Sequence, residues 1–380
     1  MGTVRFLLAL CVVATHSPGG AIFGITMMSG ITAVQCFYVI SGFLITMILN
    51  EREDYKNLGT FYLSRYLRIW PVYILITALT LYFFQWPAIT SELPRLTNWS
   101  TYAFILLSNL TIFFQDWFVF LKFENGGLAF TPVFHTLHGP QPYWFEIVPQ
   151  AWTLGVELTF YAIAPFVCRR WWGAVGLLAF GIAVRMILAG HFGISLNSAF
   201  LYRFAPAEMM LFGAGAVMYF VGRLICPLVP KLTIALCIFF VLAFSYMSFF
   251  KDHTNQLMDH YFGGSNIQQL LLGNYPILIM MTLAVPSLFY GTRTLRFDRL
   301  LGEMSYPMYI CHVLIFTLIN TYLPAGAQLG NALYVVLVLA TSLALVLLLI
   351  LPIDNVRRSL GRRDKADFAV TPPTVAATPH

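Results

Sequence analysis

The chain has 380 residues, of which 59% are hydrophobic and only 10% are charged, and its mean hydropathy is +0.75. This composition excludes an ordinary soluble domain and indicates one integral membrane domain. A net charge of +6 would suggest a nucleic-acid partner in a soluble protein. Here the basic residues gather at the ends of hydrophobic runs, which indicates orientation in a membrane and no nucleic acid.

Eleven apolar runs follow one another along the chain. They lie near residues 4–25, 30–49, 68–86, 101–120, 150–168, 172–190, 204–222, 231–250, 268–290, 305–323 and 332–351. The first run lacks a charged leader and a small-residue cleavage site, so we expect a retained helix and not a signal peptide. Clusters of Arg and Lys mark cytoplasmic ends and predict that both termini are cytoplasmic.

The run at 101–120 breaks the alternation of inside and outside ends. It contains Asn109, Gln115 and Asp116, which are costly in contact with lipid. We therefore expect it to be re-entrant or to lie along the membrane interface. The predicted fold class is an all-α polytopic membrane protein with about ten transmembrane helices and this one additional segment.

The loop at 121–149 is the longest polar connection and is expected outside the membrane. It carries His135 and His138, but no third ligand has suitable spacing, so we expect no metal. The six cysteines show no CxxC spacing and are expected to be small core residues. We expect a membrane-embedded domain over residues 1–355 and a basic, disordered cytoplasmic tail over 356–380.

Arg5 and His16 are the most informative pair. They are eleven positions apart, so in a helix they differ by about 20° in direction and about 16 Å in height. Only apolar residues, Cys11 and Thr15 lie between them. The pair fits either a snorkelling arginine with a separately bonded histidine, or two groups that line a polar cavity.

Two further motifs follow in the second and third runs. In FYVISGFLIT, Ser41 and Gly42 are expected to allow close helix packing. In SRYLRIWPVY, Arg65 and Arg68 share one helix face, with Pro71 in or just after the first turn. Such an arginine pair is either an orientation anchor or a clamp for phosphate groups.

The later runs carry isolated ionisable residues. Glu157 lies inside WTLGVELTFY and is expected either to pair with Arg185 or Arg203 or to take part directly in chemistry. Glu208 lies in the seventh run, and His312 lies two turns into the tenth.

These motifs occur in an order and spacing that resemble the acyltransferase-3 family of bacterial integral-membrane acyltransferases. The resemblance rests on the Arg5–His16 helix, FYVISGFLIT, SRYLRIWPVY, WTLGVELTFY and SYPMYICH, and extends to about Arg358. It implies a protein of the bacterial inner membrane that O-acylates, most often O-acetylates, a cell-surface or exported glycan. The family commonly has two consecutive acids in its fifth helix, whereas here Leu158 follows Glu157.

The resemblance also implies roles for residues. It predicts His16, Arg5 and Glu157 as catalytic residues. It predicts that Arg65, Arg68, Ser41, Tyr73 and Trp152 bind the donor, acetyl-CoA. His16 would act as a general base or as a nucleophile, and we favour the base because donor and acceptor held in one cavity need no covalent intermediate.

A secondary transporter or lipid-linked sugar flippase would also need intramembrane charges. Transporters often show two repeated halves with broken helices, and the sequence shows no such symmetry.

Overall fold

The computed structural model describes residues 1–17, 20–22, 25–92, 96, 98–131, 141–192, 198–225, 275–293, 295–322 and 331–354. Within these residues, seven helices are long and apolar enough to cross a membrane. The predicted class, an all-α polytopic membrane protein, is confirmed. The predicted run at 231–250 and the tail at 356–380 lie outside the described residues.

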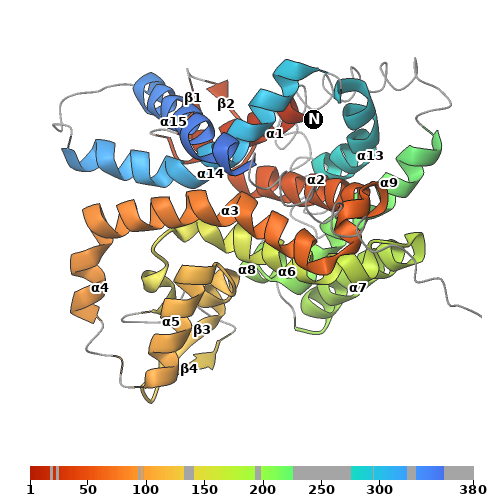
Figure 1. The fold of residues 1–380 in the computed structure, drawn as a ribbon. Coiled ribbons are helices and arrows are strands. Elements are labelled where there is room, and N and C mark those ends of the chain that lie inside the picture. The colour runs from red at the N-terminus through yellow and green to blue at the C-terminus, as the bar shows by residue number, and fades with distance from the viewer. Residues whose placement is uncertain are drawn as a thin grey trace, which may run out of the picture.

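The first half of the chain contains α1 (Gly2–Thr15), β1 (Ala21–Ile22), β2 (Ile25–Thr26), α2 (Gly30–Glu51), η2 (Glu53–Lys56), α3 (Leu58–Thr80), η3 (Leu81–Gln85), α4 (Trp86–Glu92), α5 (Trp99–Thr111), η5 (Gln115–Phe120), β3 (Leu121–Glu124), β4 (Gly127–Phe130), η6 (Pro142–Phe145), η7 (Pro149–Ala151) and α6 (Trp152–Val167). The second half contains α7 (Trp171–Gly190), α8 (Ala199–Tyr202), α9 (Ala205–Ile225), α13 (Tyr275–Thr292), α14 (Arg296–Tyr322), α15 (Asn331–Leu345) and η8 (Val346–Ile350). Figure 1 shows α3 running through the middle of the molecule, with α6 on one side of it and α14 on the other.

The first helix is shorter than the apolar run predicted. α1 ends at Thr15, although the run continues to Ile25, because SPGG follows His16 and cannot extend a helix. The Ser17 hydroxyl closes the end by donating to the carbonyl oxygen of Ala14 at 2.7 Å. His16 therefore lies at the C-terminal cap of the helix and not in its interior.

The third helix starts earlier than predicted. α3 begins at Leu58, where the Asn57 side chain accepts hydrogen bonds from the backbone N–H groups of Gly59 and Thr60. Pro71 is consequently well inside α3, and the expectation that it lies near the first turn was wrong. Arg65 and Arg68 lie between this cap and the proline.

The segment 101–120 does not form one spanning helix. α5 has 13 residues and ends where Ile112 and Phe114 take left-handed backbone conformations, after which η5 begins. Thirteen residues rise only about 20 Å, less than the hydrocarbon thickness of a bilayer. This break agrees with a re-entrant or interfacial segment.

Part of the loop at 121–149 is regular structure. β3 and β4 form an antiparallel hairpin that pairs Leu121 with Phe130 and turns at Asn125 and Gly126, both with positive φ. An Asn-Gly turn of this kind matches the twist of the two strands. His135 and His138 lie outside the described residues.

Helices α2 and α9 pack with their backbones in close contact. A side chain added at Gly42 would meet the backbone of Phe212, and one added at Gly215 would meet the backbone of Val39. The expectation that Gly42 serves close packing is confirmed. Cys11, Cys36, Cys168 and Cys311 are free and buried, as expected of small core residues.

A buried ion pair joins α7 to α9. Nη2 of Arg185 lies 2.9 Å from Oε1 of Glu208, which also accepts a hydrogen bond from the Gln35 amide at 3.0 Å. Glu208 is 0% exposed, so its charge has no water to solvate it. Together with Gln35 of α2, this ion pair links α2, α7 and α9.

Replacing one member of this pair should destabilise the fold. We expect Glu208→Ala to lower the free energy of unfolding by about 3–5 kcal/mol, because it leaves a buried guanidinium without its partner. Denaturant unfolding of the detergent-purified protein measures this change. The exposed pair of Lys122 and Glu124 is the control, and Glu124→Ala should cost less than about 1 kcal/mol. Equal losses in the two variants would contradict the expectation.

Candidate functional site

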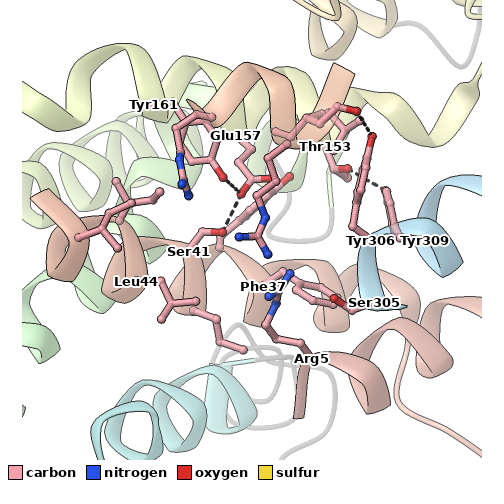
Figure 2. Close-up of a pocket in the computed structure, with 18 of the residues that line it drawn as sticks. Arg5, Phe37, Ser41, Leu44, Thr153, Glu157, Tyr161, Ser305, Tyr306 and Tyr309 are labelled. Atoms are coloured by element: carbon pink, nitrogen blue, oxygen red, sulfur yellow. Dashed lines mark hydrogen bonds between the residues drawn. The ribbon is translucent and has the colours of Figure 1, made fainter. Parts of the chain in front are cut away.

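Helices α2, α3, α6 and α14 enclose a cavity of about 300 Å³, which Arg5 of α1 also reaches. Figure 2 shows Arg5 entering from one side and Glu157 with Tyr161 from the other. The cavity has three parts: a cationic part, an apolar wall from α2 and a hydroxyl-rich end. Ser41, between Phe37 and Leu44, and the hydroxyl of Tyr38 are polar groups on the otherwise apolar α2 wall.

The cationic part contains four arginines, namely Arg5, Arg52, Arg65 and Arg68. Arg68 lies 3.6 Å from the carboxylate of Glu303, and Arg52 lies 3.2 Å from that of Asp54. Arg5 forms no side-chain hydrogen bond or ion pair with any described residue.

Arg65 has neutral partners. Its Nη2 donates to the hydroxyls of Tyr55 at 3.2 Å and Ser64 at 3.3 Å, and its Nε has no partner among the described residues. Guanidinium groups bind phosphate and carboxylate oxygens in pairs. Among the described residues, the four arginines outnumber the three carboxylates that line the cavity or pair with its arginines, namely Glu157, Glu303 and Asp54, so this part is suited to an anion.

Glu157 lines the cavity and forms no ion pair with an arginine of the described residues. Its Oε1 accepts hydrogen bonds from the Ser41 hydroxyl at 2.8 Å and from the Tyr161 hydroxyl one turn along α6. The alternative that Glu157 pairs with Arg185 or Arg203 was wrong, because Arg185 binds Glu208 and Arg203 lies 4.0 Å from Glu146. Glu157 is thus held by two hydroxyl groups and stays in contact with the cavity.

His16 does not line this cavity. It is exposed at the end of α1, where its Nδ1 lies 3.0 Å from the carbonyl oxygen of Val12. Its ring lies 4.8 Å from that of His312, which in turn lies 5.9 Å from the ring of the cavity residue Tyr309. The contacts between His16 and the cavity therefore pass through His312 and Tyr309.

Two predicted donor-binding residues lie outside the cavity lining. Tyr73 is fully buried and donates to the carbonyl oxygen of Asn109 at 2.7 Å, which ties α3 to the end of α5. The Trp152 ring supports the guanidinium of Arg203 at 4.8 Å. The structure thus brings together Arg5, Ser41, Arg65, Arg68 and Glu157 of the predicted set, without His16, Tyr73 and Trp152.

The motifs contained further cavity residues that sequence reasoning had not singled out. Tyr161 lies four positions after Glu157, a spacing that already predicts one helix face. Tyr306 and Tyr309 lie in SYPMYICH, and their hydroxyls donate to the carbonyl oxygens of Ile69 and Gln150. Thr153 donates to the Tyr309 hydroxyl at 2.8 Å and completes the hydroxyl-rich end.

Two buried carboxyl groups lie outside the seven candidate spans. Asp116 is 0% exposed and Glu146 is 4% exposed. Burial raises the pKa of Asp116 to about 7 and that of Glu146 to about 8, and the nearby Arg203 guanidinium only partly offsets this effect. The single guanidinium of Arg203 does not compensate the burial of both groups, so the protonated forms of Asp116 and Glu146 are favoured.

Taken together, these features define a polytopic membrane protein with a cationic cavity between its helices. A family model described as an acyltransferase domain matches residues 2–351, nearly the whole chain. The chain belongs to the acyltransferase-3 family. Searches of curated proteins and of solved structures found no match.

The buried carboxyl groups predict how stability depends on pH. The folded protein binds these protons more tightly than the unfolded chain, so the stabilisation is present at low pH and is lost as pH rises through about 7 and about 8. We expect the melting temperature to fall from about pH 5 to about pH 9. Asp116→Asn should weaken this dependence, because the amide is neutral throughout.

Thermal unfolding of the purified protein across this pH range measures the effect. Glu124→Gln is the control, since Glu124 is an exposed carboxylate on the nearby hairpin. If Asp116→Asn and Glu124→Gln show the same pH dependence, Asp116 does not hold a proton in the folded state.

Proposed function

We propose that this protein transfers an acetyl group from cytosolic acetyl-CoA to a hydroxyl of a cell-surface or exported glycan, with His16 as the general base. The observation that carries the proposal is the cavity with four arginines at one part and an apolar wall beside them. Membership of the family supports acyl transfer as the reaction class. The donor, the acceptor and the base are our inference from the residues.

The cationic part suits the phosphates of the donor. Arg65 and Arg68 point from one face of α3, and Arg5 adds a guanidinium that has no other partner among the described residues. A volume of about 300 Å³ is small for a ligand pocket. We therefore infer that the slender thioester arm enters along the α2 wall while the nucleotide stays at the arginines.

The charge distribution supports entry from the cytosol. Arg52, Lys56, Arg65 and Arg68 cluster where α2 ends and α3 begins, and Arg169 and Arg170 follow α6. Basic residues of short connections favour the cytoplasmic side. Acetyl-CoA, a charged cytosolic metabolite, would reach the arginines from this side without crossing the bilayer.

The tautomer of His16 suits a base. A carbonyl oxygen can only accept, so the Val12 carbonyl receives the hydrogen of Nδ1 and the lone pair stays on Nε2. The acceptor hydroxyl oxygen attacks the thioester carbonyl carbon while Nε2 takes its proton. The carbon–sulfur bond then breaks, and the CoA sulfur leaves with the electron pair and is protonated.

Donor and acceptor would meet between the cavity and His16. The thioester approaches the hydroxyl-rich end at Thr153 and Tyr309, the part of the cavity nearest the imidazoles. The acceptor approaches His16, which is exposed at the end of α1. Glu157 holds Ser41 and Tyr161 in the cavity wall, so we assign it to shaping the donor site.

Removing the base should abolish transfer. We expect His16→Ala to lower the rate of acetyl transfer roughly 10²- to 10⁴-fold, because a placed base contributes about that much. Mass spectrometry of surface glycans, from cells lacking the gene and complemented with each variant, measures O-acetyl content. His191→Ala is the control, since His191 is an exposed histidine at the end of α7.

Wild-type O-acetylation in folded His16→Ala protein would refute the proposed role. An acetylated His16 peptide, isolated from protein given acetyl-CoA without acceptor, would show instead that His16 is a nucleophile.

Removing a phosphate-binding arginine should weaken donor binding. We expect Arg68→Ala to raise the KM for acetyl-CoA roughly tenfold or more while kcat changes little, because a charge-assisted hydrogen bond is lost. Steady-state kinetics with purified protein measure both constants. Arg170→Ala is the matched control, because Arg170 is exposed and packs on Trp172 away from the cavity. An unchanged KM in Arg68→Ala would remove Arg68 from the donor site.

A further inference from the structure

A second imidazole lies against the proposed base. The ring centroids of His16 and His312 are 4.8 Å apart, and the ring planes are inclined by 54°. His312 comes from α14 and is 0% exposed. Packing of α1 against α14 brings together two residues from opposite ends of the chain.

Each ring is oriented by the backbone of its own helix. Nδ1 of His312 lies 2.6 Å from the carbonyl oxygen of Tyr309, which can only accept its hydrogen. The same holds for His16 and Val12. Both neutral rings therefore carry their lone pair on Nε2, and that of His312 is buried without a hydrogen-bond partner among the described residues.

Among the residues that the structure describes, the other titratable groups next to the pair are two phenols and a thiol. Tyr309 faces His312 from α14, and the hydroxyl of Tyr334, on α15, lies 3.4 Å from the His312 carbonyl oxygen. Cys311 adjoins His312 in the sequence. In the described part of the chain, neither imidazole forms an ion pair with a carboxylate.

We propose that His312 is a positioning residue for His16, and that the two imidazoles take up the proton of the acceptor hydroxyl as one unit. This inference rests on the proposed function. When His16 takes that proton, its imidazolium has no carboxylate partner in the described chain. The neutral ring of His312 is the polar group that packs against it.

The same contact limits the pair to one proton at a time. Two imidazolium ions this close repel each other, and the His312 ring is buried away from water, so protonation of one ring opposes protonation of the other. The proton taken from the hydroxyl is therefore released readily to the departing CoA sulfur. The reaction ends with both rings neutral, as it began.

The coupling can be measured without acyl transfer. Diethyl pyrocarbonate reacts with neutral imidazole, so the rate of His16 modification from about pH 5 to about pH 8, followed by peptide mass spectrometry, reports the proton on this ring. In His312→Phe a buried ring is kept but both nitrogens are lost. We expect the midpoint of His16 modification to move by at least about half a pH unit.

Kinetics give the second readout. We expect His312→Phe to lower kcat at least about tenfold and to leave the KM for acetyl-CoA within about twofold, because the arginine cavity is untouched. His312→Gln restores a polar group and should recover part of both effects. It also replaces His312→Phe in the test if the larger ring prevents folding.

Cys311→Ser is the matched control, since it alters the adjacent buried residue and keeps both imidazoles. It should show the wild-type midpoint. If folded His312→Phe shows the wild-type pH dependence of His16 modification, the inference is overturned. A shifted midpoint in a protein that transfers no acetyl group would support the imidazole pair and refute the proposed function, so the two failures are distinguishable.

Discussion

The cost of an unpaired charge among apolar side chains decides where the ionisable residues of this protein lie. Arg185 and Glu208 meet that cost by pairing with each other in full burial. Arg5, Arg65 and Arg68 meet it differently, because they border a cavity that can admit water or an anion. The first arrangement stabilises the fold, and the second leaves guanidinium groups available to a ligand.

Glu208 in α9 and Glu157 in α6 show the same division. Glu208 has a guanidinium and an amide as partners and no access to the cavity. Among the described residues, Glu157 has the hydroxyls of Ser41 and Tyr161 as its only hydrogen-bond partners. Hydroxyl groups orient a carboxylate but carry no charge that would compensate its own. The carboxylate of Glu157 can therefore interact electrostatically with a ligand in the cavity. Both glutamates lie in apolar helices, but Glu208 stabilises the fold and Glu157 lines the cavity.

The short first helix places the proposed base outside the lining of the arginine cavity. Because α1 ends at Thr15, His16 lies at a helix end against His312, and the arginine cavity begins near the other end of the same helix. For direct transfer, the proposed acyl donor would have to extend from the cavity past Tyr309 to an acceptor beside His16. The residues between, Tyr309 and His312, then become part of the proposed site.

The sequence by itself determined the membrane class, the family and most of the charged residues that line the cavity, since hydropathy and helical spacing are local properties. The three-residue spacing of Arg65 and Arg68 and the isolation of Glu157 predicted their place, and Ser41 followed from its motif. The end of α1, the roles of Tyr73 and Trp152, and the partners of Arg185 and Arg203 could not be predicted in this way. Those features depend on which helices pack together, and the pairing of His16 with His312 exists only because α1 packs against α14. Contacts between distant segments depend on the shapes of whole helix faces, which no single segment encodes.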